Sequence, residues 1–488
     1  MSLLPLTQSA AGPIRFGTDG WRGVLGVDVT AATVLQVAVA AAQELAATAP
    51  ENLDSQEVLI GFDRRFLAPE LAELAAAAVQ DCHLLPLLTT GPTPTPTMSW
   101  AVRQRQALGA LILTASHNPP EWLGLKIKGP FGGSVESTFT ARVERRLRAG
   151  SVISPGPGPT SISRFDAWTP YLAALSRLVD CRMLRQRLQH LGWQVLVDPM
   201  HGAAAGGLPR LLGDAVVEIR SGRDPLFGGH APEPLAPNLQ ELIHKMQVAT
   251  ATGQTVVGLA FDGDGDRLAA VDETGAFCST QLLIPLLIDH LGRDPTQPGV
   301  VVKTVSGSDL MVTVAKNHGR RVVETAVGFK HIAAVMRQEA VLLGGEESGG
   351  VGFGHHMPER DGLLAALLVL EALVTAEQPL GQHLTALQQR SGLQLHYDRL
   401  DLHLGDPATR NRLLKALEQQ PPQTIAGEPV TDINHQDGIK LRLGKGLGHW
   451  LMLRFSGTEP LLRLYCEAPT PEQVRTTLAW AEAFVQGA

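Results

Sequence analysis

The segment Asp262-Gly-Asp-Gly-Asp-Arg267 places three carboxylates at alternate positions, directly after the apolar run Thr255–Phe261. This run is short and rich in β-branched residues, which predicts a buried strand, and a second apolar run, Leu268–Asp272, follows the acidic loop. Glycines between the acids let the backbone turn tightly enough for the carboxylates to converge. Carboxylates this close repel one another unless a cation compensates them, and without His or Cys they suit a hard cation. The loop therefore predicts a Mg²⁺ site formed by Asp262, Asp264 and Asp266.

Two other interpretations of the acidic loop are weaker. An EF-hand calcium loop would use Glu273 at its twelfth position, but its sixth position needs glycine and is Arg267 here. The predicted strands on both sides also replace the helices of an EF-hand. A solvated acidic turn would leave the three carboxylates uncompensated. Arg267 itself is either a salt-bridge partner of the cluster or a ligand for a phosphate that shares the metal.

A serine follows another predicted strand. The apolar run Ala107–Leu113 predicts a buried strand, and Ser116 lies at its carboxyl end, where open α/β sheets place their ligands. Ser116 belongs either to a plain turn or to a nucleophilic site, in which a base or metal must activate it. The surrounding residues do not form a G-x-S-x-G elbow, which argues against an α/β-hydrolase. If serine and acidic loop act together, they must meet across a domain interface.

Two later loops also offer polar groups. Glu346 and Glu347 follow the apolar run 340–343 and are either surface charges or partners for the hydroxyls of a hexose. The second loop suits a phosphate dianion, because it offers a guanidinium, two hydroxyls and a flexible backbone, although an ordinary hairpin turn has the same composition. Its residues are Arg454, Ser456, Gly457 and Thr458.

Helical and strand patterns alternate along the chain, which predicts sheets covered by helices. Residues 34–47 and 69–81 have helical patterns, and residues 58–61 form a predicted strand between them. The length of 488 residues fits roughly three or four domains. A Gly/Pro/Ser-rich stretch, 151–163, is the clearest linker, and a unit of different texture begins near residue 394.

The composition argues against several classes of protein. A net charge of −7 disfavours a nucleic-acid partner, and no uncharged apolar run is long enough to cross a membrane. Residues 1–13 lack the basic and apolar regions of a signal peptide. The four cysteines are scattered without a C-x-x-C motif, so we expect reduced core residues and a cytoplasmic location.

Five motifs, in this order along the chain, resemble those of the α-D-phosphohexomutase superfamily, which includes phosphoglucomutases and phosphomannomutases. They are Phe16–Gly23 (FGTDGWRG), Thr114–Pro120 (TASHNPP), Asp262–Arg267 (DGDGDR), Gly344–Gly350 (GGEESGG) and Arg454–Tyr465 (RFSGTEPLLRLY). The resemblance implies three similar α/β sheet domains and a smaller C-terminal α+β domain around a central cleft. It divides the chain into a phosphoserine domain at 1–160, a metal-binding domain at 161–277, a sugar-binding domain at 278–392 and a phosphate-binding domain at 393–488.

The resemblance also implies a role for individual residues. Ser116 would be a phosphoserine whose phosphate joins the three aspartates as a metal ligand. Lys126 or His117 would be the general base, with Arg22 helping to orient it. A lysine base needs a lowered pKa, which we expect from cationic neighbours in a closed cleft. The implied substrate ligands are Arg267, Gly328, Lys330, Glu346, Ser348, Arg454, Ser456, Gly457 and Thr458.

The implied activity is the interconversion of hexose 1-phosphate and hexose 6-phosphate, with glucose favoured over mannose, through a bound hexose 1,6-bisphosphate. Alternatives are a glucose-1,6-bisphosphate synthase, a phosphoglucosamine mutase, which Glu347 and Gly350 disfavour, a metal-dependent phosphatase, and a non-catalytic sugar-phosphate-binding protein. Small hexose phosphates are the expected partners of a monomer or homodimer, without nucleic acid or membrane. One departure stands out: the family usually reads Asn-Gly-x-Lys where this chain has Leu123-Gly-Leu-Lys126. We expect the lost amide to alter the packing of the serine loop or its contacts.

Overall fold

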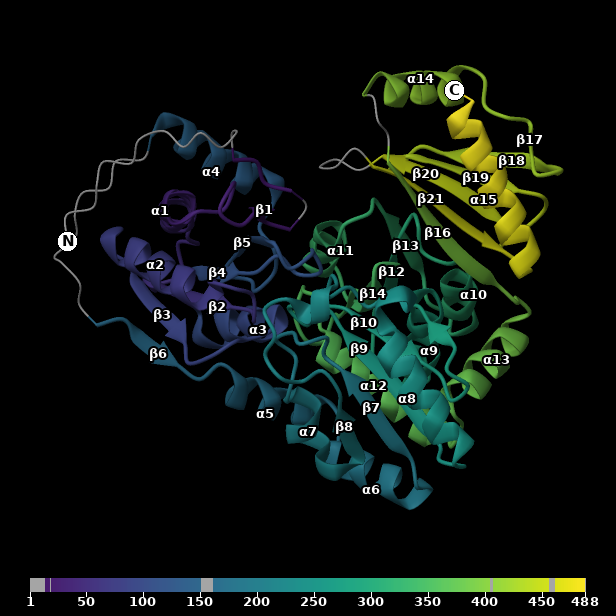
Figure 1. The fold of residues 1–488 in the computed structure, drawn as a ribbon, viewed down its shortest axis with the longest axis horizontal. Coiled ribbons are helices and arrows are strands. Elements are labelled where there is room, and N and C mark those ends of the chain that lie inside the picture. The colour runs from purple at the N-terminus through teal and green to yellow at the C-terminus, as the bar shows by residue number, and fades with distance from the viewer. Residues whose placement is uncertain (1–13, 18, 151–160, 404–406, 456–460, 488) are drawn as a thin grey trace.

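The computed structural model describes residues 14–17, 19–150, 161–403, 407–455 and 461–487. Four β-sheets follow one another along the chain, with helices packed against them (Figure 1). The first three sheets are mixed, and the fourth is antiparallel. The predicted class, three α/β units followed by a C-terminal α+β unit, is confirmed.

The first sheet has the strand order β1-β5-β4-β2-β3-β6. Strands β4, β2, β3 and β6 run parallel, and β5 returns antiparallel beside β4. The serine loop is therefore the connection between the carboxyl end of β4 and the start of β5. The elements are β1 (Trp21–Val24), α1 (Ala31–Ala47), β2 (Glu57–Phe62), α2 (Ala68–Asp81), β3 (Leu85–Thr89), α3 (Thr95–Arg105), β4 (Gly109–Leu113), β5 (Trp122–Lys128), α4 (Ser137–Ala149) and β6 (Ser163–Phe165).

The second sheet, ordered β11-β10-β9-β7-β8, repeats this plan, because its antiparallel strand β10 follows the acidic loop after β9. Its elements are α5 (Trp168–Leu178), α6 (Cys181–Leu191), β7 (Gln194–Asp198), α7 (Gly207–Leu212), η1 (Gly213–Ala215), β8 (Val216–Glu218), η2 (Phe227–Gly229), η3 (Ala236–Leu239), α8 (Gln240–Ala251), β9 (Val256–Phe261), β10 (Leu268–Val271) and β11 (Phe277–Cys278).

The third sheet, ordered β13-β12-β14-β15, places the Glu346 loop between β14 and the antiparallel β15. Its elements are α9 (Thr280–Gly292), β12 (Val300–Thr304), α10 (Asp309–Asn317), β13 (Val322–Thr325), α11 (Phe329–Met336), β14 (Val341–Gly345), β15 (Val351–Phe353), α12 (Gly362–Ala376) and α13 (Leu380–Ser391). The second and third sheets share one apolar core that extends from Tyr171 to Leu395. Helix α9 contributes to it by contacting both β10 and β14.

The fourth sheet, ordered β16-β21-β20-β19-β18-β17, has its own apolar core. Its elements are β16 (His396–His403), α14 (Pro407–Gln419), β17 (Thr424–Ile425), β18 (Glu428–Asn434), β19 (Ile439–Leu443), β20 (Trp450–Phe455), β21 (Leu461–Ala468) and α15 (Pro471–Gln486). Among the described residues no single helix is long and apolar enough to cross a membrane. The pair α12 and α13, bent by 78°, meets the length and composition of a span only when taken together.

The predicted strands and helices lie close to the observed ones. The strand predicted before the serine is β4, and the strands predicted around the acidic loop are β9 and β10. Helix α1 begins three residues before its predicted start at residue 34, because Thr30 caps it and accepts a hydrogen bond from the Thr33 N–H. Most of the predicted linker, residues 151–160, lies outside the described residues.

Candidate active site

Ser116 and the acidic loop meet, as predicted. Ser116 Oγ lies 2.8 Å from Asp262 Oδ2 and donates a hydrogen bond to it across the boundary between the first and second sheets. Ser116 is fully buried, and its φ of +53° puts it in the left-handed region that residues other than glycine seldom adopt. The loop thus holds a single hydroxyl in a defined position beside the carboxylates.

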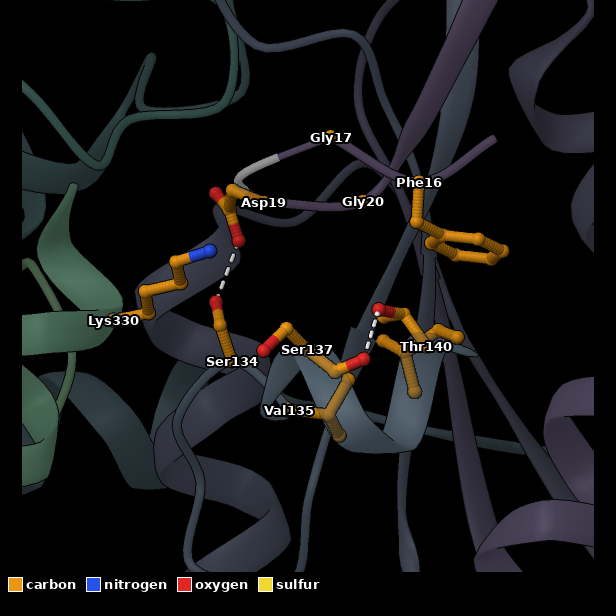
Figure 2. Close-up of a pocket in the computed structure, with 10 residues that line it drawn as sticks. Phe16, Gly17, Asp19, Gly20, Ser134, Val135, Ser137, Thr140 and Lys330 are labelled. Atoms are coloured by element: carbon orange, nitrogen blue, oxygen red, sulfur yellow. Dashed lines mark hydrogen bonds between the residues drawn. The ribbon is translucent and has the colours of Figure 1, made fainter. Parts of the chain in front are cut away.

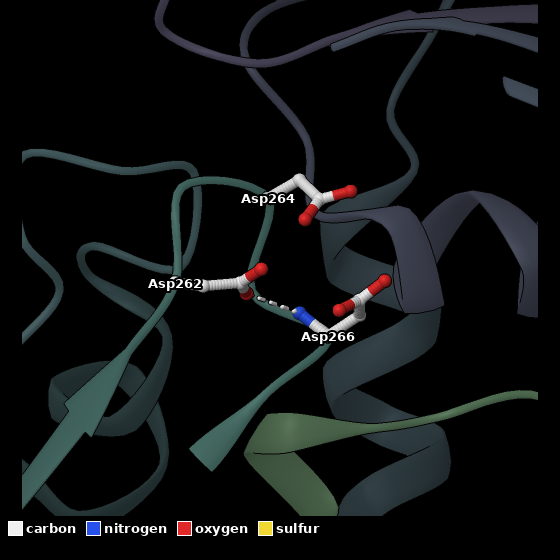
Figure 3. A group of neighbouring side chains, drawn as sticks. All are labelled: Asp262, Asp264 and Asp266. Carbon is white, nitrogen blue, oxygen red and sulfur yellow. Dashed lines mark hydrogen bonds between the residues drawn. The ribbon is translucent and has the colours of Figure 1, made fainter. Parts of the chain in front are cut away.

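The three aspartates of the acidic loop point toward one another (Figure 3). One ligand oxygen from each lies within 4.8 Å of the others, and all three side chains are buried. The Asp266 N–H donates to Asp262 Oδ1 at 3.0 Å. Asp264 Oδ1 and Asp266 Oδ1 are buried and have no hydrogen-bond partner among the described residues. Burial, reinforced by the charges of Asp266 and Asp264, raises the pKa of Asp262 well above its ordinary value. Two orphaned carboxylate oxygens in a buried cluster of acids fit a hard divalent cation.

Glu273 does not belong to this cluster. Its carboxylate accepts hydrogen bonds from the Gly381 and Gln382 N–H groups at the start of α13. Strands β9 and β10 flank the acidic loop. The EF-hand interpretation is therefore wrong.

Lys126 differs from expectation. Its ammonium lies 2.8 Å from carboxylate oxygens of Asp19, Asp264 and Asp266. Burial by itself would lower the pKa of Lys126, but these three carboxylates raise it well above its ordinary value. The expected lowering of the Lys126 pKa is therefore wrong: the groups that surround this ammonium most closely are acids rather than cations.

His117 follows Ser116 in the serine loop. Its Nδ1 is 3.4 Å from Ser116 Oγ. Burial, with Arg267 and Arg22 nearby, lowers the pKa of the imidazole well below its ordinary 6.5. The ring is therefore neutral at neutral pH. Arg22 donates to Asn118 Oδ1 at 2.7 Å, which ties it to the same loop.

Arg360 and Asp19 were not among the predicted site residues. The Arg360 Nη2 lies 2.6 Å from Asp19 Oδ2 and 2.8 Å from Asp266 Oδ2, and its Nη1 lies 3.5 Å from Glu346 Oε2. One buried guanidinium thus joins the N-terminal loop, the acidic loop and the Glu346 loop. The Arg360-Asp361 pair is visible in the sequence. The role of Arg360 is not, because its three partners come from distant parts of the chain.

Predicted substrate ligands also lie in and before the Glu346 loop. Glu346 is buried, and burial raises the pKa of its carboxyl to about 7, with Arg360 opposing the shift. Ser348 is half-buried at the turn before β15. Gly328 has a φ of +121° and is the N-cap residue that precedes α11. The Lys330 side chain from α11 extends toward Asp19 and lines a small pocket with Ser134 and the start of α4 (Figure 2).

Two predicted arginine ligands lie beside carboxylates. Arg454 Nε donates to Asp437 Oδ2 at 3.0 Å, and the same oxygen accepts the Val327 N–H at 2.9 Å. Arg267 Nε lies 3.9 Å from Asp262 Oδ2 and from Asp266 Oδ1, so it belongs to the acidic cluster. Ser456, Gly457 and Thr458 lie outside the described residues.

Leu123, which replaces the family's usual asparagine, is a core residue. Its side chain is fully buried in the apolar core of the first sheet, and its backbone pairs with Gly23 of β1. The residue that replaces the usual amide therefore fills the core beneath the loop rather than lining the site.

Comparisons with known proteins agree with this geometry. Four models of "phosphoglucomutase/phosphomannomutase" match the chain: α/β/α domain I at residues 13–152, domain II at 169–275, domain III at 280–391 and the C-terminal domain at 412–480. A phosphoglucomutase/phosphomannomutase of Thermococcus kodakarensis is 28% identical, over 95% of this chain and 96% of its own. A probable phosphoglucosamine mutase of Methanothermobacter thermautotrophicus is 30% identical over the same shares. The crystal structure of a putative phosphomannomutase from Thermus thermophilus has a TM-score of 0.84 and 32% identity, and the match covers 98% of this chain and 100% of that one.

Proposed function

Since the chain belongs to the phosphoglucomutase/phosphomannomutase family of the α-D-phosphohexomutase superfamily, we propose that it interconverts hexose 1-phosphates and hexose 6-phosphates. The reaction class is that of an isomerase that moves a phosphoryl group within its substrate. The observation that carries the proposal is the 2.8 Å hydrogen bond from Ser116 Oγ to Asp262 Oδ2. It places a candidate nucleophile directly beside a carboxylate of the acidic cluster.

In the proposed cycle Ser116 carries a phosphoryl group in the resting enzyme. The bond between phosphorus and the serine oxygen breaks while phosphorus bonds to a free hydroxyl of a hexose phosphate. The hydroxyl proton passes to a base, which passes it on to the serine oxygen as that oxygen leaves. The bound hexose 1,6-bisphosphate then turns around, and Ser116 takes back the other phosphoryl group by the reverse of the same step.

Asp262, Asp264 and Asp266 would hold the Mg²⁺ that the family uses. When bound, this ion would offset the negative charge on the oxygens of the transferring phosphoryl group. The Arg267 guanidinium, 3.9 Å from two of the same carboxylates, adds a second positive charge at this place. Arg360 bridges Glu346 and Asp266, so that a sugar held by the Glu346 loop would lie beside the acidic loop.

His117 is our choice for the base. Its lowered pKa leaves the imidazole neutral at neutral pH, and its Nδ1 lies 3.4 Å from Ser116 Oγ. Lys126 keeps its proton beside three carboxylates and would act as a fixed positive charge. Arg22 would help to orient the base through its hydrogen bond to the side chain of Asn118.

Glucose phosphates are the proposed substrates, with mannose phosphates second. A phosphoglucosamine mutase is a further candidate, because the 30% identical relative carries the name of a probable phosphoglucosamine mutase. A bisphosphate synthase would use the same serine but release the bisphosphate.

A coupled assay of glucose 1-phosphate to glucose 6-phosphate conversion, with Mg²⁺ and a trace of glucose 1,6-bisphosphate, tests the proposal. The same assay with mannose 1-phosphate and with glucosamine 1-phosphate, in parallel, identifies the preferred sugar. We expect turnover in the wild type and in the exposed control Ser161→Ala, and none in Ser116→Ala. Bisphosphate accumulating from a separate phosphoryl donor would point to the synthase. Binding without turnover of any of these sugars would overturn the proposal.

A further inference from the structure

Arg65 is a fully buried arginine beneath the serine loop, and sequence analysis gave it no role. Its Nη2 donates to the carbonyl oxygens of Ser116 at 2.7 Å and Asn118 at 2.6 Å. Its Nη1 donates to those of Pro119 at 2.8 Å and Trp122 at 3.0 Å. Its Nε donates to Asp63 Oδ2 at 3.2 Å. All five N–H donors of a guanidinium are therefore used, three of them on the loop that carries the nucleophile and one on the first residue of β5.

Asp63 links this guanidinium to the other side of Ser116. The Asp63 carboxylate accepts a hydrogen bond from Thr114 Oγ1 at 2.6 Å, and Thr114 Oγ1 accepts one from the Ser116 N–H at 2.8 Å. The N–H and the C=O of Ser116 are thus both fixed by the same buried pair, one through Thr114 and one directly. This matters because the left-handed φ of Ser116 is a conformation that the chain does not favour unaided.

The second domain covers the back of the arginine. The Phe227 ring lies 4.9 Å from the Arg65 guanidinium carbon, and Arg223 Nη2 donates to the Arg65 carbonyl at 3.3 Å. The aromatic face and Asp63 together compensate a charge that is removed from water. The arginine is thus built into the fold and has no donor left for a sugar or a phosphate.

We propose that Arg65 is a positioning residue that fixes Ser116 Oγ for phosphoryl transfer, acting with Asp63 and Thr114. This inference rests on the proposed function. Because Arg65 acts on the nucleophile and its donors are all occupied, its loss lowers kcat and leaves KM unchanged. A displacement of the reacting oxygen by about 1 Å lowers kcat by roughly 100-fold.

The test compares Arg65→Lys and Arg65→Met with the same two substitutions at Arg64. Arg64 is the adjacent, half-buried arginine, and it donates instead to the Ser221 carbonyl of the second domain. We expect both Arg65 variants to lose kcat by about 100-fold at unchanged KM, and both Arg64 variants to match the wild type. Thr114→Val, which removes the linking hydroxyl, should resemble Arg65→Met, and Thr114→Ser, which keeps it, should recover most of the wild-type kcat.

Chemical rescue separates positioning from general damage to the fold. Millimolar guanidinium should restore part of the kcat of Arg65→Ala, and it should leave Ser116→Ala inactive. Folded Arg65 variants with wild-type kcat, or with a raised KM at full kcat, would overturn the inference. A loss of kcat in Thr114→Ser as large as that in Thr114→Val would also overturn the inference. An inactive wild type would refute the proposed function instead, whereas an active wild type with equally active Arg65 variants refutes this inference alone.

Discussion

At the scale of single residues, Glu346 gives a pH signature. Burial raises the pKa of its carboxyl from an ordinary 4.5 to about 7. Between these values the native protein holds a proton that the unfolded chain releases, so the free energy of unfolding falls as pH rises through this window. The destabilisation caused by burying the ionised Glu346 carboxylate is fully present above pH 7 and absent below pH 4.5.

We therefore expect Glu346→Gln to remove about 3 kcal/mol of pH-dependent destabilisation between pH 4.5 and 7. Denaturant unfolding of both proteins at several pH values, without added metal, measures the difference in slope. Parallel pH profiles for the two proteins would show that Glu346 is ionised throughout the window and would contradict the burial effect.

Single residues also show what a sequence can and cannot predict about the site. Ser116 and the three aspartates were found because each follows a recognisable strand at its carboxyl end. The charge state of Lys126 was missed because Asp19, which lies 107 positions earlier, and the two aspartates surround it only in the folded chain. Arg65 was missed for the same reason, since its partners are mainly backbone carbonyls that no side-chain pattern reveals.

At the scale of elements, the start of α12 connects the second and third units. Asp361 caps the helix by accepting the Leu364 N–H at 3.0 Å, and its carboxylate also accepts the Tyr171 hydroxyl at 2.7 and 2.8 Å. His356 Nε2 lies 3.0 Å from the same carboxylate. Because Arg360 precedes the cap, this arrangement also places the guanidinium that joins the three loops.

Tyr171→Phe should lower the free energy of unfolding by about 2 kcal/mol, because it removes a buried donor to a charged acceptor. The ring should keep its place, since Trp100 and Trp168 pack edge-on against it at 6.3 and 6.4 Å. Denaturant unfolding measures the loss. A change below about 0.5 kcal/mol would show that His356 and the helix N–H satisfy the carboxylate alone.

The elements themselves were largely predictable. Apolar runs such as 107–113 and 255–261 allowed little besides buried strands, and the observed strands begin within two residues of them. The short strands β6, β8, β11 and β17 have only two or three residues each, so their sequences carry too little periodicity to predict.

At the scale of the whole molecule, Asp437 ties the fourth unit to the third. One carboxylate oxygen accepts both the Val327 N–H and the Arg454 Nε–H.

Asp437→Ala should release the Arg454 guanidinium and raise KM for the hexose phosphate roughly tenfold with a smaller change in kcat. Steady-state kinetics would show this, with the exposed Asp432→Ala on β18 as the control. An unchanged KM would mean that Arg454 does not bind the substrate phosphate.

The central claim is that Ser116 carries the phosphoryl group that the substrate receives. Its direct test is mass spectrometry of the chain after incubation with glucose 1,6-bisphosphate and Mg²⁺, followed by addition of a hexose monophosphate. We predict one phosphoryl group on the Ser116 peptide, which leaves when the monophosphate is added and appears as hexose bisphosphate. A phosphoryl group on another residue, its release as inorganic phosphate, or full mutase turnover by Ser116→Ala would contradict the account.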